Sequence, residues 1–192
     1  MNEAPHWHEF NDTTQLAEAL ASDTARLLTQ QIEQRNQADL YVSGGQSPVG
    51  FFNSLANILI KWDKINISLV DERCVPHDHA DSNTALVKRH LLHAHAGNAH
   101  WFDIVDRDGK PTPPPLSPQP QAIAVLGMGE DSHTASLFPD AANISEGLDL
   151  TRPADYLQLQ PSRAAHLRIS LNASALIQMN RLLLLIQGEK KR

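Results

Sequence analysis

Three features are scarce in this 192-residue chain: cysteine, long apolar runs and positive charge. The single cysteine, Cys74, leaves no partner for an internal disulfide, which favours a reducing compartment and predicts a cytoplasmic location. No apolar run reaches the roughly 18 residues that a membrane-spanning helix needs, and the first ten residues lack the apolar core of a secretory signal. The net charge of −6 argues against general nucleic-acid binding, which depends on a basic surface.

The remaining composition is typical of a globular protein, with 41% hydrophobic and 20% charged residues. A chain of this length is sufficient for one domain with a sizeable core, so we expect a single α/β domain over residues 1–192. The acidic net charge still permits a phosphorylated small molecule as ligand. One or two arginines and a few backbone N–H groups are enough to bind a phosphate.

Apolar periodicity predicts strands that alternate with helices. This pattern is typical of a Rossmann-like α/β fold, with a mostly parallel sheet and helices on both faces. Ligands of such sheets bind beyond the carboxyl ends of the strands. The proline-rich residues 110–120 are expected to form a loop. We expect strands at 40–42, 65–70, 101–105, 123–126, 157–159, 167–171 and 182–186, and helices at 13–34, 48–60, 82–92 and 172–179.

The first two expected strands are each followed by residues suited to an anion. The first is followed by two glycines and two serines, and Pro48 then begins a helix whose free N–H groups can hold a phosphate. The alternative is a tight turn with Ser47 as a helix cap. The second is followed by Asp71, Glu72 and Arg73, where Arg73 could bind a phosphate or pair with a carboxylate. The loop residues of the first cluster are Ser43, Gly44, Gly45, Gln46 and Ser47.

The strand at 123–126 is followed by a third cluster, residues 127–134, which reads G-x-G-x-x-S and then His133. Glu130 and Asp131 would repel a pyrophosphate, so a dinucleotide site is not expected. The pattern favours a catalytic turn, because histidine titrates near neutral pH and is a common general base. The alternative is that His133 caps the following helix.

Two further groups of residues carry weaker signals. Lys190 and Lys191 follow the last expected strand, although basic chain ends are common. Six histidines lie within residues 77–100, but neither cysteine nor an H-E-x-x-H pattern accompanies them. We therefore interpret them as a solvated polar face, with adventitious metal binding as the alternative, and expect no catalytic metal. Cys74 is interpreted as a packing residue.

Several of these motifs, in the same order, resemble those of the 6-phosphogluconolactonase family. Residues 43–48 resemble its glycine-rich loop, and residues 71–76 with 81–83 resemble its second motif. Residues 127–139 resemble its signature almost letter for letter, and residues 167–171 and 188–191 resemble its two later motifs. The likeness covers nearly the whole chain.

The resemblance implies a fold of the NagB/RpiA/CoA transferase type and a cofactor-free enzyme of the oxidative pentose phosphate pathway. Such an enzyme hydrolyses 6-phospho-D-glucono-1,5-lactone to 6-phospho-D-gluconate. The resemblance makes His133 the base, and Asp131 or Asp71 would hold its imidazole. It also places the glycine-rich loop, Arg73, Arg168 and Lys191 around the substrate phosphate.

The chain departs from the family in two places. Ser132 replaces a glycine in the catalytic turn, and if the backbone there has a positive φ, serine costs about 1 kcal/mol or more. The chain also ends at Arg192, where the family continues with a helix and a strand, so we expect a C-terminally short member with an uncovered sheet edge.

Two other functions remain open from the sequence. One is a glucosamine-6-phosphate isomerase/deaminase, in which the second motif is expected to read Asp-Glu-Tyr and not Asp-Glu-Arg. The other is a non-catalytic sugar-phosphate-binding protein that has lost its catalytic turn. The sequence leaves the oligomeric state undetermined.

Overall fold

The structure is a computed structural model that describes residues 5–114 and 122–188. Within these ranges, no helix is both long enough and apolar enough to cross a membrane. Part of the expected proline-rich loop and the lysines at 190 and 191 lie outside the described residues. Residues 110–114 contain no helix, as expected for a loop, and Pro111 forms an isolated bridge with Val105.

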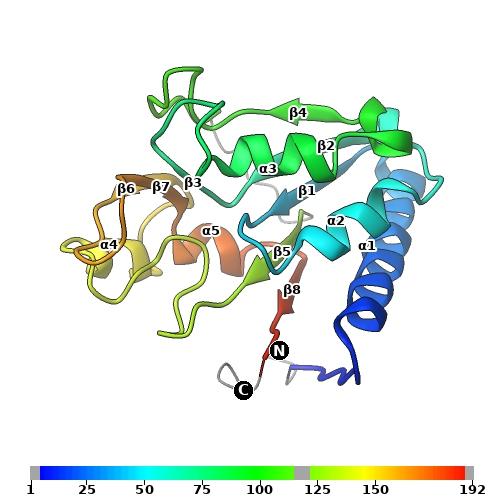
Figure 1. The fold of residues 1–192 in the computed structure, drawn as a ribbon, viewed down its shortest axis with the longest axis horizontal. Helices are drawn as coiled ribbons and strands as arrows, with labels where there is room; N and C mark the ends of the chain where they lie inside the picture. Colours follow the sequence, from blue (N-terminus) through cyan, green and yellow to red (C-terminus); the bar gives the residue numbers. More distant parts are fainter. Residues whose placement is uncertain (1–4, 115–121, 189–192) are drawn as a thin grey trace.

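The centre of the fold is a five-stranded sheet in the order β4-β2-β1-β5-β8 (Figure 1). All four strand pairings in it are parallel, which confirms the expected mostly parallel sheet. The inner strands are buried because apolar side chains cover both of their faces. The strands are β1 (Ala38–Val42), β2 (Ile65–Leu69), β4 (His100–Phe102), β5 (Ile123–Gly127) and β8 (Arg181–Leu185).

A second, antiparallel sheet corrects part of the prediction. It has the order β3-β7-β6, with β3 at Asp71–Arg73, β6 at Tyr156–Leu159 and β7 at Arg168–Leu171. Residues 71–73 were not among the expected strands, and the antiparallel pairing of β6 and β7 in a separate sheet was not foreseen. The chain leaves β2 at Val70, whose carbonyl accepts a hydrogen bond from the N–H of Leu171, so the chain passes directly from one sheet to the other.

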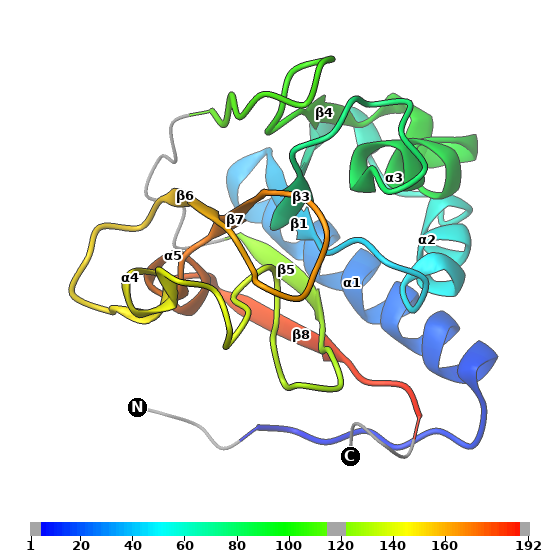
Figure 2. The ribbon, with the colours of Figure 1, turned by 60° about the vertical axis from the view of Figure 1, so that its left-hand side comes forward.

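Four helices lie near their expected positions, three of them shorter than expected, whereas the short helix α4 was not predicted. The longest, α1, begins after Asp12, whose carboxylate accepts the N–H groups of Thr14 and Gln15, and ends at Asn36 in the left-handed conformation. It packs against α2, β1 and β5, and Figure 2 shows it running along these strands. The helices are α1 (Thr13–Arg35), α2 (Val49–Ala56), α3 (Asn83–His90), α4 (Ile144–Leu148) and α5 (Ala173–Ile177), with 3-10 turns at Trp62–Lys64 and Ala94–Asn98.

The edge strand β8 differs from the inner strands. Among the described residues it pairs only with β5, and Leu182 and Leu184 are 44% and 49% exposed. The other neighbour of β5 is β1, which is almost fully buried. The core therefore centres on β1, β2 and β5, and the carboxyl ends of β1 and β5 adjoin the second sheet.

Candidate active site

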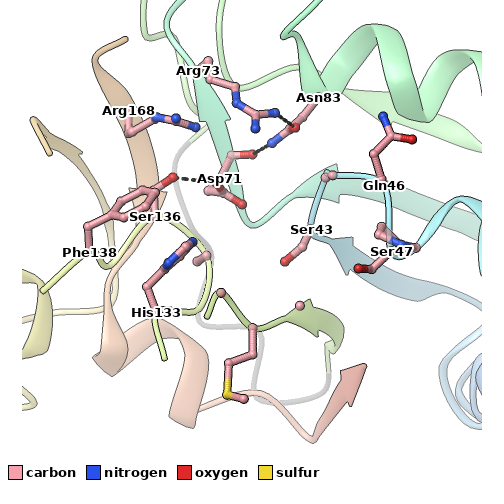
Figure 3. Close-up of a pocket in the computed structure, with 17 residues that line it drawn as sticks. Ser43, Gln46, Ser47, Asp71, Arg73, Asn83, His133, Ser136, Phe138 and Arg168 are labelled. Atoms are coloured by element: carbon pink, nitrogen blue, oxygen red, sulfur yellow. Dashed lines mark hydrogen bonds between the residues drawn. The ribbon is translucent and has the colours of Figure 1, made fainter. Parts of the chain in front are cut away.

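A pocket of about 310 Å³ lies where the carboxyl ends of β1 and β5 meet β3 and β7 (Figure 3). This location is the strand end at which parallel sheets bind their ligands. The pocket brings together residues from the first three sequence clusters and from β7. Those predicted from the sequence are Ser43, Gly44, Gly45, Gln46, Ser47, Asp71, Arg73, His133 and Arg168.

The glycine-rich loop forms one wall of the pocket. The N–H of Ser43 donates to the carbonyl of Val125, which joins the loop to β5, and Gly45 has a φ of 94° that favours glycine. The hydroxyl of Ser43 is buried and has no hydrogen-bond partner among the described residues. Ser47 makes no side-chain cap on α2, so the alternative of a plain helix cap is wrong. The loop therefore brings one hydroxyl without a hydrogen-bond partner, that of Ser43, to the wall of the pocket.

Two arginines face the same space from neighbouring positions of β3 and β7. The antiparallel register pairs Arg73 with Arg168, and neither forms an ion pair within the described part of the chain. Arg168 is buried, and its Nε has no hydrogen-bond partner there. Burial, and then the adjacent charge of Arg73, lower the pKa of Arg168. Two like charges held together in this way favour an anion between them.

Asn83 lies between Gly44 of the loop and Arg73, and it was missed as a site residue. Its Oδ1 accepts from Nη1 of Arg73 at 2.5 Å, and its Nδ2 donates to the carbonyl of Asp71 at 2.9 Å. A Cβ on Gly44 would lie 1.9 Å from the same Oδ1, so the loop can approach Asn83 only with glycine at position 44. The sequence did place Asn83 in the second motif, but its contact with Gly44 depends on the tertiary structure.

Glu72 lies beneath this cluster and holds it in place. One carboxylate oxygen accepts the N–H groups of Arg73 and Asn83 at 2.7 and 2.8 Å. The other accepts the N–H of Thr84 at 2.7 Å and the hydroxyl of Ser82 at 3.2 Å. Burial raises the pKa of Glu72, and the three N–H donors oppose that shift. The carboxylate therefore fixes β3 to the first turn of α3.

The base candidate, His133, lies on the turn that follows β5. Its Nδ1 is 2.5 Å from Oδ1 of Asp131. Partial burial acts to raise the pKa of Asp131, but the hydrogen bond to His133 opposes it, and the pKa lies below its ordinary value. A carboxylate at Nδ1 fixes the tautomer that carries its proton there. This leaves Nε2 as the unprotonated nitrogen, with no hydrogen-bond partner in the described residues. His133 lines the pocket and does not cap a helix.

The turn itself is conformationally demanding. Ser132 has a φ of 66°, in the left-handed region that favours glycine. A Cβ on Gly129 would lie 2.3 Å from the His133 ring, so the ring packs directly on the glycine backbone. The N–H of Gly129 also donates to the carbonyl of His133 at 2.8 Å. The family glycine that Ser132 replaces thus corresponds to a position with positive φ.

Two more residues of the pocket were not singled out from the sequence. Phe138 stacks on the His133 ring with 4.0 Å between ring centroids, and the guanidinium of Arg168 lies 5.5 Å from its centroid. Ser136 donates to Oδ2 of Asp71 at 2.6 Å. Asp71 therefore contacts Ser136, and the imidazole of His133 is held by Asp131, which resolves the two alternatives left open by the sequence.

The remaining candidates lie elsewhere. Lys191 is outside the described residues. Burial raises the pKa of Cys74 to about 11, and its side chain packs against the core, as expected for a packing residue. The histidines of residues 77–100 do not converge on one site, although His79 lies close to Asp81 and His166.

Comparison with known proteins assigns the family. The model of the family described as "Glucosamine-6-phosphate isomerases/6-phosphogluconolactonase" matches residues 11–192. A 6-phosphogluconolactonase of Neisseria meningitidis is 38% identical over 97% of this chain and 84% of its own, and one of Pseudomonas putida is 39% identical over 96% and 79%. The crystal structure of a 6-phosphogluconolactonase from Shewanella baltica superposes with a TM-score of 0.85 at 33% identity, covering 95% of this chain and 81% of that one.

These matches agree with the geometry of the pocket, because they extend over the segments that carry the loop, both arginines and the histidine turn. The chain therefore belongs to the glucosamine-6-phosphate isomerase/6-phosphogluconolactonase family.

Proposed function

We propose that this protein hydrolyses 6-phospho-D-glucono-1,5-lactone to 6-phospho-D-gluconate in the oxidative pentose phosphate pathway, with no cofactor. The named relatives support this choice within the family. The second motif supports it too, since it reads Asp-Glu-Arg at residues 71–73. A cytoplasmic location is proposed because the single cysteine, Cys74, has no partner for an internal disulfide.

His133 serves as the general base. Its free Nε2 takes a proton from water, and the resulting hydroxide attacks the lactone carbonyl. Asp131, on Nδ1, orients the ring and stabilises the imidazolium that forms. The tetrahedral intermediate collapses, the bond to the ring oxygen breaks, and the imidazolium returns the proton to that oxygen. Backbone N–H groups of the glycine-rich segments or a cationic side chain stabilise the oxyanion.

The phosphate binds at the other end of the pocket. Arg73 and Arg168 supply the charge, and the Ser43 hydroxyl and the backbone of residues 44–47 supply further donors. Lys191 is proposed as an additional contact from the family pattern. Binding the phosphate away from the reacting carbonyl positions the ring against His133 and so lowers the entropic part of the barrier.

One observation carries the proposal: the same pocket holds a carboxylate-oriented histidine and two arginines that form no ion pair with any residue that the structure describes. A histidine base suits an activated ester such as a δ-lactone, and the arginine pair suits a dianionic phosphate. Neither the oriented histidine alone nor the arginine pair alone would distinguish an enzyme from a binding protein.

The test is a lactonase assay with 6-phosphogluconolactone, corrected for spontaneous hydrolysis. We expect a kcat within the common enzyme range of roughly 1–10³ s⁻¹. Release of ammonia from glucosamine 6-phosphate would favour the isomerase/deaminase activity instead. Binding of 6-phosphogluconate without any turnover of the lactone would show a non-catalytic sugar-phosphate-binding protein.

A further inference from the structure

A group of three potential metal ligands lies outside the pocket lining. His79 and Asp81 belong to the loop between β3 and α3, whereas His166 lies just before β7. Oδ2 of Asp81 is 3.0 Å from Nε2 of His166 and 3.9 Å from Nδ1 of His79. One ligand atom from each residue lies within 4.8 Å of the other two, and this is the only such group found among the described residues.

The spacing suits a small divalent cation. Ligand atoms about 2.1 Å from a tetrahedral zinc ion lie about 3.4 Å apart, and the two measured separations fall on either side of that value. Two imidazoles and one carboxylate form a donor set that first-row transition cations prefer to Mg²⁺ or Ca²⁺. The three side chains are 30–55% exposed, so a water molecule could reach the fourth position.

The two histidines differ in the free protein: His79 offers a nitrogen lone pair, whereas Nε2 of His166 donates to Oδ2 of Asp81 at 3.0 Å, so an ion would displace the proton from that nitrogen. Nδ1 of His79 accepts the N–H of Asp81 at 3.0 Å, so this nitrogen is unprotonated, and a cation would replace that local contact. The rings of His79 and His166 meet edge to face with centroids 5.3 Å apart. His166 holds its position with a φ of 69°, in the left-handed region.

The backbone holds the two segments together before any ion binds. The N–H of Cys74 donates to the carbonyl of Leu167 at 2.8 Å, next to the antiparallel pair of β3 and β7. The arginines of the pocket attach to the same segments, because Arg73 donates to the carbonyl of Asp81 and Arg168 donates to the carbonyl of Ala165. The ligands are thus carried by a preformed frame, which reduces the ordering that binding requires.

We propose that His79, Asp81 and His166 bind one divalent transition-metal cation of the zinc class. The ion cross-links the β3–α3 loop to the segment that enters β7. It stabilises the fold at this point and takes no part in lactone hydrolysis, since none of its ligands lines the pocket.

The test begins with treatment of the full chain with EDTA and desalting. Zinc is then titrated into the protein, and binding is measured by calorimetry. We expect one saturable ion, and a rise in melting temperature because the ion binds the folded state. His79→Gln and His166→Asn should each weaken binding by at least about tenfold, and zinc should no longer raise their melting temperatures. Asparagine is chosen at position 166 because it tolerates the left-handed backbone.

Two controls address the other histidines. A His90→Gln/His93→Gln variant removes a pair on or next to α3, and His133→Ala removes the base; both should retain the parent affinity. Zinc affinity unchanged in His79→Gln and His166→Asn, or no saturable binding by the parent, would overturn the proposal. Cobalt(II) provides a second readout on the parent protein. If the cobalt-loaded protein showed nothing but the weak spectrum of octahedral cobalt, the proposal would also be overturned.

Discussion

The two ends of the pocket are built in different ways. The arginine end rests on regular structure: Arg73 and Arg168 are paired across β3 and β7, and buried Glu72 fixes β3 to α3. The histidine end rests on a turn, where Ser132 has a positive φ and the Asp131 side chain is 51% exposed. In the proposed mechanism, phosphate binding thus falls to regular secondary structure and proton transfer to a turn with a positive φ.

This difference has a physical reason. Phosphate binding needs several donors held at fixed positions, and strands and helix ends provide them at little cost. A general base must approach the reacting atoms and change its protonation state, which an exposed turn at a strand end allows. Variants at the two ends should therefore differ in which kinetic constant they change.

The largest effect is expected at the histidine end. His133→Ala removes the base and should lower kcat by about 10²–10⁴-fold with little change in affinity for 6-phosphogluconate. Steady-state kinetics and calorimetric binding of the product measure the two quantities. His93→Ala, an exposed histidine bonded to the carbonyl of His90, is the control and should retain parent kinetics. Turnover near that of the parent in His133→Ala would exclude His133 as the base.

At the arginine end, Arg73→Ala and Arg168→Ala should chiefly raise KM. Charge-assisted hydrogen bonds are worth roughly 1.5–3 kcal/mol each, which corresponds to about 10–150-fold. Some loss of kcat is expected as well, because the phosphate orients the ring. Arg152→Ala, which removes an exposed arginine paired with Glu146, should change neither constant. Unchanged kinetics in both pocket variants would contradict the phosphate assignment.

Stability should depend on the carboxylate beneath the arginine end. Glu72→Gln turns an amide donor toward backbone N–H donors, leaving at least one unsatisfied at a cost of about 1–3 kcal/mol. In a chain of this size the melting temperature should fall by roughly 2–10 °C, measured by calorimetry. Glu146→Gln breaks only an exposed ion pair and should cost less than about 1 kcal/mol. Equal melting temperatures of the two variants would show that Glu72 does not hold β3 to α3.

The strain in the histidine turn should give a smaller effect. Ser132→Gly relieves a positive φ worth about 1 kcal/mol, so kcat should rise with at most a modest increase in melting temperature. Asn36→Gly relieves a positive φ at the end of α1, far from the turn in sequence and outside the pocket lining, and should leave kcat unchanged. If kcat stays constant or falls in Ser132→Gly, the turn accommodates serine without loss.

No effect is expected when metal ions are removed. The proposed reaction uses His133, Asp131 and the arginines, so lactone hydrolysis should survive prolonged EDTA treatment. The same treatment should lower the melting temperature of zinc-loaded protein by removing the proposed ion at His79. Loss of activity on chelation, with recovery on adding zinc, would contradict a metal-free mechanism.

The local sequence determined the parallel core and the three clusters at its strand ends. Buried strands such as β1 and β5 are nearly continuous apolar runs, and residues after a strand reach the ligand edge of any parallel sheet, so both features are local in sequence. The positive φ of Ser132 was raised only as a condition, from the glycine that the resembled family has at this position, and the structure shows it.

The tertiary structure alone decided which distant residues meet. Nothing local showed that residues 71–73 form a strand, because their charges are compensated by partners such as Ser136 and the first turn of α3. The pairing of Arg73 with Arg168, the contact of Asn83 with Gly44 and the approach of His166 to Asp81 join residues far apart in the chain. Such contacts follow from the packing of two sheets, which short-range patterns do not encode.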